Sequence, residues 1–159
     1  HAEVGFIARH LMVAKVRGRF TEVSGTVEVG ETLAETSVRA LASAASFSTN
    51  QADRDGHLRS ADFFDVETYP ELTFVSTSVS SDSMIGDLTI KGVTRSVTFD
   101  LEFDGVQADP WGNTKAGFTA TTAINRSDWG LTWNAAIEGG GVLVSDKIAI
   151  TLEVELLKG

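Results

Sequence analysis

The chain has 159 residues, with 13 Lys and Arg against 22 Asp and Glu, a formal net charge of −9 and no cysteine. So acidic a chain is not expected to bind nucleic acid generally, because neutralising phosphates requires a high density of basic side chains. The lack of cysteine excludes disulfides, thiolate metal sites and a cysteine nucleophile. No apolar run approaches the roughly 18 residues of a membrane-spanning helix, and the length predicts one domain over residues 1–159.

The beginning of the chain bears on its cellular location. The first residues lack the charged and apolar regions of a signal peptide. We therefore expect a cytoplasmic protein, with a periplasmic or secreted location as the alternative if a signal has been removed.

The first half of the chain predicts strands that are irregular in phase. Val16 and Phe20 fall on one face of an extended strand, whereas Val23 and Val27 fall on the other. A β-bulge near Thr21–Glu22 would explain this change of face.

Two short segments are predicted to interrupt these strands as helices. Residues 10–15 would form a short helix between the first two strands. Asn50 to Ser60 has the pattern of a capped helical turn, because Asn50 can accept from the free N–H groups and Asp53 lies near the positive end of the helix. Residues 38–47 contain helix-forming residues, but the flanking Ser and Thr favour a strand.

The second half of the chain alternates strictly between apolar and polar residues. This period of two recurs in 84–90, 96–104, 115–125 and 147–156, and it predicts strands with one buried and one solvated face. Gly, Asp and Asn occupy the gaps between these stretches, which suits short links between antiparallel neighbours. The pattern indicates about eight strands and two short helices, arranged as a closed barrel or a sandwich.

Motifs of the common enzyme classes are missing from the sequence. The chain has no Gly-x-Ser-x-Gly elbow, no His-Glu-x-x-His helix, no P-loop and no dinucleotide fingerprint. The run at 53–56 resembles the start of a calcium loop, but the twelfth position is Phe64 rather than Glu. The only histidines are His1, His10 and His57, and we predict no metal site from them.

Small residues recur on the faces that are predicted to point inward. An eight-stranded barrel is just wide enough to be filled by side chains or to hold one small ligand, and alanines on its inner face would leave space. The alternative is a solid core in which small residues pack against large ones. The inward alanines are Ala40, Ala42, Ala44, Ala116 and Ala120, and the aromatic lining would be Phe20, Phe74, Phe99 and Phe118.

Basic residues are concentrated near the start of the chain. Between residues 5 and 20 the sequence has no Asp or Glu but contains Arg9, His10, Lys15, Arg17 and Arg19. Such a patch suits an anionic head group, such as a phosphate, at the mouth of a barrel. A solvated face that balances the acidic remainder of the chain is the equal alternative.

Seven blocks of sequence, in their order along the chain, carry a family resemblance. They are RHLMV at 9–13, KVRGRF at 15–20, DRDGHLRSADFFD at 53–65, YPELTF at 69–74, GDLTIKGVTR at 86–95, INRSDWGL at 124–131 and VSD at 144–146. In these blocks the chain resembles the YceI-like family of lipocalin-like isoprenoid-binding proteins. The resemblance implies an all-β, eight-stranded antiparallel lipocalin-like barrel with one or two short helices, closed around a long apolar pore.

The resemblance also implies a function without catalysis. We predict that the chain binds, transports or stores a long isoprenoid lipid, either an isoprenoid quinone or a polyprenyl phosphate, and uses no metal and no other cofactor. The predicted ligand-binding residues are Phe6, Val16, Phe20, Phe63, Phe74, Leu88, Phe118, Ala120, Ile124, Trp129 and Trp133. The predicted head-group contacts are Arg9, His10, Arg17 and Arg126. Of the aromatic pairs Phe63/Phe64 and Trp129/Trp133, at least one is expected to plug an end of the barrel.

Two functions of other classes remain open at this point. A small hydrolase or isomerase could use Asp53, His57 and Arg126, because an Asp four residues before a His can orient the imidazole as a base. The chain could instead be a structural interaction module without a ligand. A homodimer is compatible with either class and with the carrier.

Overall fold

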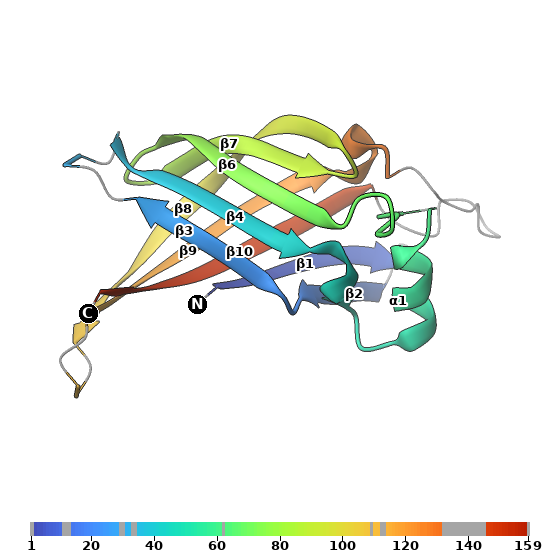
Figure 1. The fold of residues 1–159 in the computed structure, drawn as a ribbon, viewed down its shortest axis with the longest axis horizontal. Helices are drawn as coiled ribbons and strands as arrows, with labels where there is room; N and C mark the ends of the chain where they lie inside the picture. Colours follow the sequence, from blue (N-terminus) through green and yellow to red (C-terminus); the bar gives the residue numbers. More distant parts are fainter. Residues whose placement is uncertain are drawn as a thin grey trace.

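The computed structural model describes residues 2–10, 14–28, 31–32, 35–61, 63–108, 110–111, 114–131 and 146–158, and along β1 and the first half of β2 it describes the backbone alone. These residues form one antiparallel sheet of ten strands, ordered β3-β4-β6-β7-β8-β9-β10-β1-β2-β5 (Figure 1). In chain order the strands are β1 (Ala2–His10), β2 (Ala14–Phe20), β3 (Val23–Glu28), β4 (Ser37–Ser43), β5 (Phe47–Ser48), β6 (Glu71–Val79), β7 (Ser83–Ile90), β8 (Val93–Ala108), β9 (Thr114–Asn125) and β10 (Lys147–Lys158). The helices are the 3-10 turn η2 (Ala44–Ser46), the α-helix α1 (Ala52–Arg59) and the 3-10 turn η3 (Arg126–Trp129).

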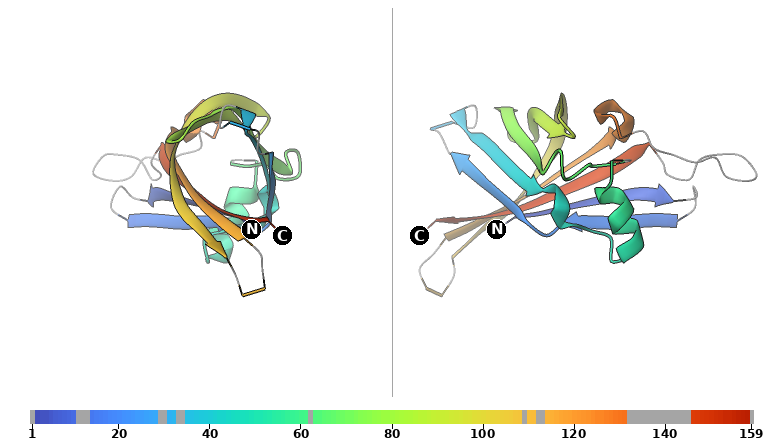
Figure 2. Two further views of the ribbon diagram at one scale, coloured as in Figure 1. Left: turned by 90° about the vertical axis from the view of Figure 1, so that its left-hand side faces the viewer. Right: turned by 45° about the vertical axis from the view of Figure 1, so that its right-hand side comes forward.

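The sheet curls so that its two terminal pairs in the strand order, β3-β4 and β2-β5, belong to the same two bent stretches of chain. Only Thr21 and Glu22 separate β2 from β3, and the chain on both sides of them pairs with the segment that contains β4 and β5. The Thr21 N–H donates to the Ser46 carbonyl at 3.1 Å, and the Ser43 N–H donates to the Glu22 carbonyl at 3.0 Å. With β2 and β3 counted as one strand, and β4 and β5 as another, the ring has the eight strands predicted for the barrel. Figure 2 (left) shows the curl.

The predicted irregularity in the first half of the chain is confirmed, and one predicted helix is wrong. The change of face falls between β2 and β3, at Thr21–Glu22. Residues 10–15 do not form a helix where they are described, because Arg9 pairs with Lys15 and His10 with Ala14 in the β1–β2 hairpin. So short a helix does not offset the free-energy cost of its nucleation. The hairpin instead adds backbone pairs to an existing ladder.

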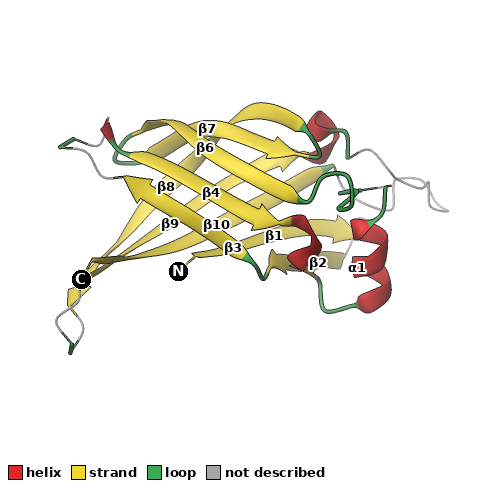
Figure 3. Cartoon of the chain, in the orientation of Figure 1, coloured by secondary structure: helices red, strands yellow, loops and turns green. Residues whose placement is uncertain are grey.

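The helix predicted within residues 50–60 is present as α1, but its cap differs from the prediction. Gln51, not Asn50, is the N-cap, and its side chain accepts from the Arg54 N–H. Asn50 has a left-handed φ of 62° and turns the chain before the helix. The strand predicted for 38–47 ends at Ser43 and continues as η2. Figure 3 shows α1, η2 and η3 at one end of the molecule.

The alternating pattern in the second half of the chain correctly predicted which side chains point to the inside of the sheet. Ala120 lies opposite Leu101 of β8 and Leu152 of β10, and it is 2% exposed. Its neighbour Thr121, on the other face of β9, is exposed. The main core consists of inward residues of β6 to β10 with Phe63, Trp129 and Leu131. In the described part of the chain, no helix is long and apolar enough to cross a bilayer.

Candidate functional site

The α1 end of the curled sheet is filled by aromatic rings. Phe47 lies with its ring centre 5.3 Å from that of Phe20 and 5.1 Å from that of Phe64. Phe20 and Phe64 are also in contact, with centres 6.1 Å apart. The rings come from β2, β5 and the segment after α1, and Phe47 is only 2% exposed. We call Phe20, Phe47 and Phe64 the aromatic plug, because their rings pack against one another at this end.

Polar contacts of α1 hold the aromatic plug in place. The buried Asp55 carboxyl group accepts from the Thr49 N–H at 2.9 Å and from the Thr49 hydroxyl at 2.5 Å. The Arg59 guanidinium donates to the Ala45 carbonyl at 3.0 Å and to the Phe47 carbonyl at 2.9 Å. These contacts fix the chain around β5 to the helix, so that α1 is a clamp on the plug. Asp53, the carboxyl group expected to act at the start of this helix, is exposed, and the buried Asp55 makes the contacts instead.

A buried cation lies close to this end of the interior. Arg126, the first residue of η3, is 5% exposed and its guanidinium donates to the Leu131 carbonyl at 2.6 Å. The guanidinium carbon lies 5.8 Å from the centre of the Phe63 ring, within the range of a cation–π contact. Burial lowers the pKa of Arg126 from its usual value, and the charge of Asp146 opposes that shift. The guanidinium stays protonated, because no ordinary shift brings an arginine near neutral pH.

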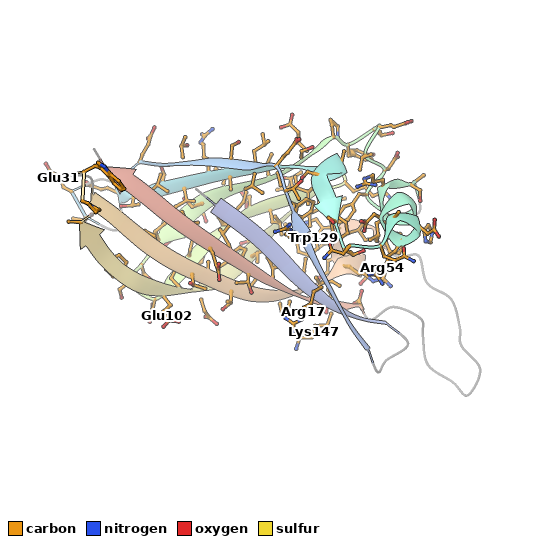
Figure 4. All side chains as sticks on the ribbon, turned by 90° about the horizontal axis from the view of Figure 1, so that it is seen from below. Arg17, Glu31, Arg54, Glu102, Trp129 and Lys147 are labelled. Carbon is orange, nitrogen blue, oxygen red and sulfur yellow. The ribbon has the colours of Figure 1, made fainter. Side chains whose placement is uncertain are left out.

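The turn η3 is tied to the neighbouring strands. The Ser127 N–H and hydroxyl each donate to the Asp146 carboxylate at 2.9 Å, and the Arg126 N–H donates to the Asp146 carbonyl at 2.8 Å. The Trp129 indole N–H donates to the Leu88 carbonyl at 3.0 Å, and the indole is 3% exposed. Figure 4 labels Trp129 among the side chains of this region. These contacts join β7, η3 and the start of β10, and they fix the position of Arg126.

Two phenylalanine rings cross the interior at its middle strands. Phe74 of β6 and Phe99 of β8 meet edge to face, with ring centres 5.2 Å apart. The Phe74 ring lies directly over Gly86 of β7, where an added Cβ would stand 2.7 Å from the Phe74 Cε1 atom and 2.6 Å from the Val75 carbonyl oxygen. The Phe74 ring can therefore occupy this position only because Gly86 has no side chain.

Other residues of the concave face are less covered. Ala40, Leu88, Leu101 and Ile150 have inward positions in the ladders, yet they are only partly buried. In a solid core such residues would be buried, because interiors pack at crystal-like density. The concave face thus combines a closely packed part with an apolar part that protein atoms cover incompletely.

The predicted ligand-binding residues divide by position. Phe20, Phe63, Phe74, Ala120, Ile124 and Trp129 are buried, while Leu88 and Phe118 are partly buried on the concave face. The side chains of Phe6 and Val16 lie outside the description, but the ladders place their backbones opposite Ile150 and Ala8. Trp133 lies outside the described residues altogether.

The predicted head-group residues are not gathered in one place. Arg17 is exposed and occupies the face of β2 opposite to Phe20, whereas Arg126 is buried against Phe63. The side chains of Arg9 and His10 lie outside the description.

Two residues of the enzyme alternative, His57 and Arg126, contact the same ring, while Asp53 is exposed. Asp53 is exposed on α1, and the His57 ring stands edge-on to Phe63 at 5.2 Å between centres. Arg126 rests on the same Phe63 ring. The described residues contain no group of three or more His, Asp or Glu side chains that could hold a metal ion.

Comparisons with known proteins give one consistent family. A family model described as the YceI-like domain matches residues 1–156. The UPF0312 protein SAS2572 of Staphylococcus aureus is 39% identical over 158 residues, which cover 98% of this chain and 92% of the relative.

Solved structures have the same curled sheet. The YceI protein of Campylobacter jejuni superposes with a TM-score of 0.79 at 31% identity, over 95% of this chain and 90% of the other. A polyisoprenoid binding domain from Saccharophagus degradans, implicated in plant cell wall breakdown, superposes with a TM-score of 0.71 at 16% identity, over 99% and 94% of the two chains. The second similarity concerns the fold alone.

Proposed function

The chain belongs to the YceI-like domain family, and from this premise we propose that it binds a long-chain isoprenoid lipid on the concave face of its sheet. The lipid would be an isoprenoid quinone or a polyprenyl phosphate, which the protein transports or stores. The polyisoprenoid binding of the Saccharophagus degradans domain, which has the same fold, supports this class of ligand.

The observation that carries the proposal is the incomplete cover of apolar residues on the concave face. Ala40, Leu88, Leu101 and Ile150 offer apolar surface that an isoprenoid tail could bury. Burial of one CH₂ group contributes about 0.8 kcal/mol, so a five-carbon unit contributes about 4 kcal/mol. A tail of several units would then exceed the roughly 4–15 kcal/mol that association costs in lost freedom.

The polarity of the two ends suggests which way the lipid lies. Arg126 supplies a buried positive charge close to Phe63 at the plugged end, and a phosphate or quinone oxygen is the group such a donor favours. The tail would then extend along Leu88, Ala120 and Phe118 towards the opposite end. Phe20, Phe63 and Trp129 would bound the site at the head-group end, and Trp133 is proposed to belong with them.

The proposed role is binding without catalysis. The exposure of Asp53 and the contact of the His57 ring with Phe63 support binding over the hydrolase or isomerase alternative. The proposal therefore rests on the apolar face and not on a set of reacting groups.

Native mass spectrometry of the purified protein tests the proposal. We expect an excess mass that organic extraction removes, and that returns when solubilised polyprenyl phosphate or isoprenoid quinone is added to the extracted protein. A single unliganded mass, together with no uptake of either lipid, would overturn the proposal.

A further inference from the structure

The strands β8 and β9 continue beyond the end of β7, and β10 accompanies β9 as far as Thr114. β7 accompanies β8 from Val93 to Asp100, and beyond residue 101 the described ladder of β8 runs to β9 as far as Ala108 and Thr114. Figure 1 shows β8, β9 and β10 reaching together away from the end that carries α1. We call the described residues of this stretch, 103–108, 110–111 and 114–118, the hairpin extension.

A β-bulge keeps the apolar side chains of the hairpin extension on one face. Phe103 lies opposite Phe118, and Val106 lies opposite Ala116, although Phe103 and Val106 are three residues apart. The register shifts between Phe103 and Gly105, so one extra residue is accommodated there. Without this shift, Val106 would fall on the opposite face of the strand. The bulge therefore continues the concave face of the sheet along the extension.

Exposure rises steadily along this apolar face. Ala120 is 2% exposed, Phe103 is 53% exposed although its ring centre lies 5.2 Å from that of Phe118, and Val106 is 59% exposed. At the turn, Trp111 is 84% exposed. Large apolar side chains exposed side by side are unusual on a protein that works alone in water. Their continuity with the concave face links this surface to the proposed lipid site.

The composition of the extension suits a lipid surface with little net charge. Tryptophan prefers the boundary between the apolar and polar layers of a bilayer. The sequence from 103 to 118 contains two Asp and one Lys, and the whole chain has a net charge of −9. Figure 4 places the exposed Glu31 and Glu102 towards this end of the molecule, while Arg17 and Lys147 lie towards the other. Anionic lipids attract basic clusters, and this end does not offer one among its described residues.

We propose that the hairpin extension docks on the surface of a neutral, zwitterionic bilayer and passes the isoprenoid tail between bilayer and concave face. The inference rests on the proposed function, because it assumes a ligand that resides in membranes. Trp111 and Val106 enter the interfacial layer, and the tail then moves along Phe103 and Phe118 without crossing a polar surface.

Sedimentation with phosphatidylcholine vesicles tests the docking. We expect the double variant Trp111→Ala/Val106→Ser to bind these vesicles about tenfold more weakly than the wild type, a change equivalent to about 1.4 kcal/mol. The matched control is Leu41→Ala/Val75→Ala, which removes two exposed apolar side chains of β4 and β6 and is expected to bind as the wild type does. Addition of phosphatidylglycerol to the vesicles should weaken binding, and added salt should restore it.

A second measurement separates this proposal from the proposed function. Both double variants should take up detergent-solubilised polyprenyl phosphate as the wild type does, because none of the four residues is among those proposed to hold the bound lipid. If the Trp111→Ala/Val106→Ser variant loses uptake from vesicles but keeps uptake from detergent, the docking is supported. If neither the wild type nor any variant takes up the lipid from detergent, the proposed function is overturned. Equal vesicle binding by the wild type and the Trp111→Ala/Val106→Ser variant overturns the docking. Concentration-dependent dimerisation of the wild type that the Trp111→Ala/Val106→Ser substitutions abolish would also overturn the docking. The exposed surface would then bind a second copy of the chain.

Discussion

The two ends of the curled sheet are built in opposite ways. At the α1 end, three phenylalanine rings pack against one another and polar contacts from α1 hold them, with Phe47 2% exposed. At the other end, the same apolar face runs outward until Trp111 is 84% exposed. The contrast teaches that one end serves stability, while the other leaves apolar surface for a ligand or a partner. Substitutions at the two ends should therefore affect different measurements.

The largest expected loss of stability comes from the aromatic plug. Phe47→Ala removes the ring that contacts both other members, and truncation of a buried phenylalanine costs about 3–5 kcal/mol of unfolding free energy. Urea denaturation measures this loss. Leu41→Ala is the control, because Leu41 is 38% exposed and its truncation should cost less than about 1 kcal/mol. Equal losses would mean that the plug is not a packed unit.

The clamp formed by α1 should give the next largest effect. Asp55→Ala leaves the buried N–H and hydroxyl of Thr49 without their shared acceptor, which should cost about 1.5–3 kcal/mol. Asp53→Ala, on the exposed side of the same helix, should change stability by less than about 0.5 kcal/mol. The same denaturation assay distinguishes them. A larger loss of stability in Asp53→Ala than in Asp55→Ala would show that Asp53, and not Asp55, holds the helix to the plug.

A pair of glycine substitutions should have opposite signs. Gly86→Ala brings a methyl group against the Phe74 ring and should destabilise the protein by about 1–3 kcal/mol. Gly56→Ala adds a methyl group within α1, where no atom lies within 4 Å of it, and should stabilise the protein by about 0.4–1 kcal/mol. Thermal melting of the two variants side by side checks both signs. A neutral Gly86→Ala would show that the Phe74 ring has room to move.

The sequence predicted the features that depend on near neighbours along the chain. Alternation placed Ala120 and Ile124 on the inward face correctly, because a period of two is imposed by each strand itself. The change of face between Val16/Phe20 and Val23/Val27 predicted the bend at Thr21–Glu22 for the same reason.

Features that depend on distant contacts were not predicted. Arg126 is buried because η3 folds back onto Leu131, Phe63 and Asp146, and nothing in its immediate sequence signals this. The exposure of Phe103 and Val106 depends on where the pairing with β7 ends, so alternation alone would place both in a core. The cap of α1 was assigned to Asn50 rather than Gln51, since the two adjacent amides differ only in backbone conformation. Both Asp53 and Asp55 lie in the first turn of α1, so the sequence pattern did not distinguish the carboxyl group that accepts from Thr49.

Lipid uptake by two tryptophan variants at adjacent residues of β4 tests the central claim most directly. Ala40 lies on the concave face and is partly buried, whereas Leu41 is exposed on the outer face. We predict that Ala40→Trp, whose indole would occupy the place of the tail, lowers uptake of solubilised polyprenyl phosphate at least about tenfold, equivalent to about 1.4 kcal/mol. Leu41→Trp should take up the lipid as the wild type does, and both variants should remain folded by circular dichroism. Undiminished uptake by folded Ala40→Trp would contradict the placement of the ligand on the concave face.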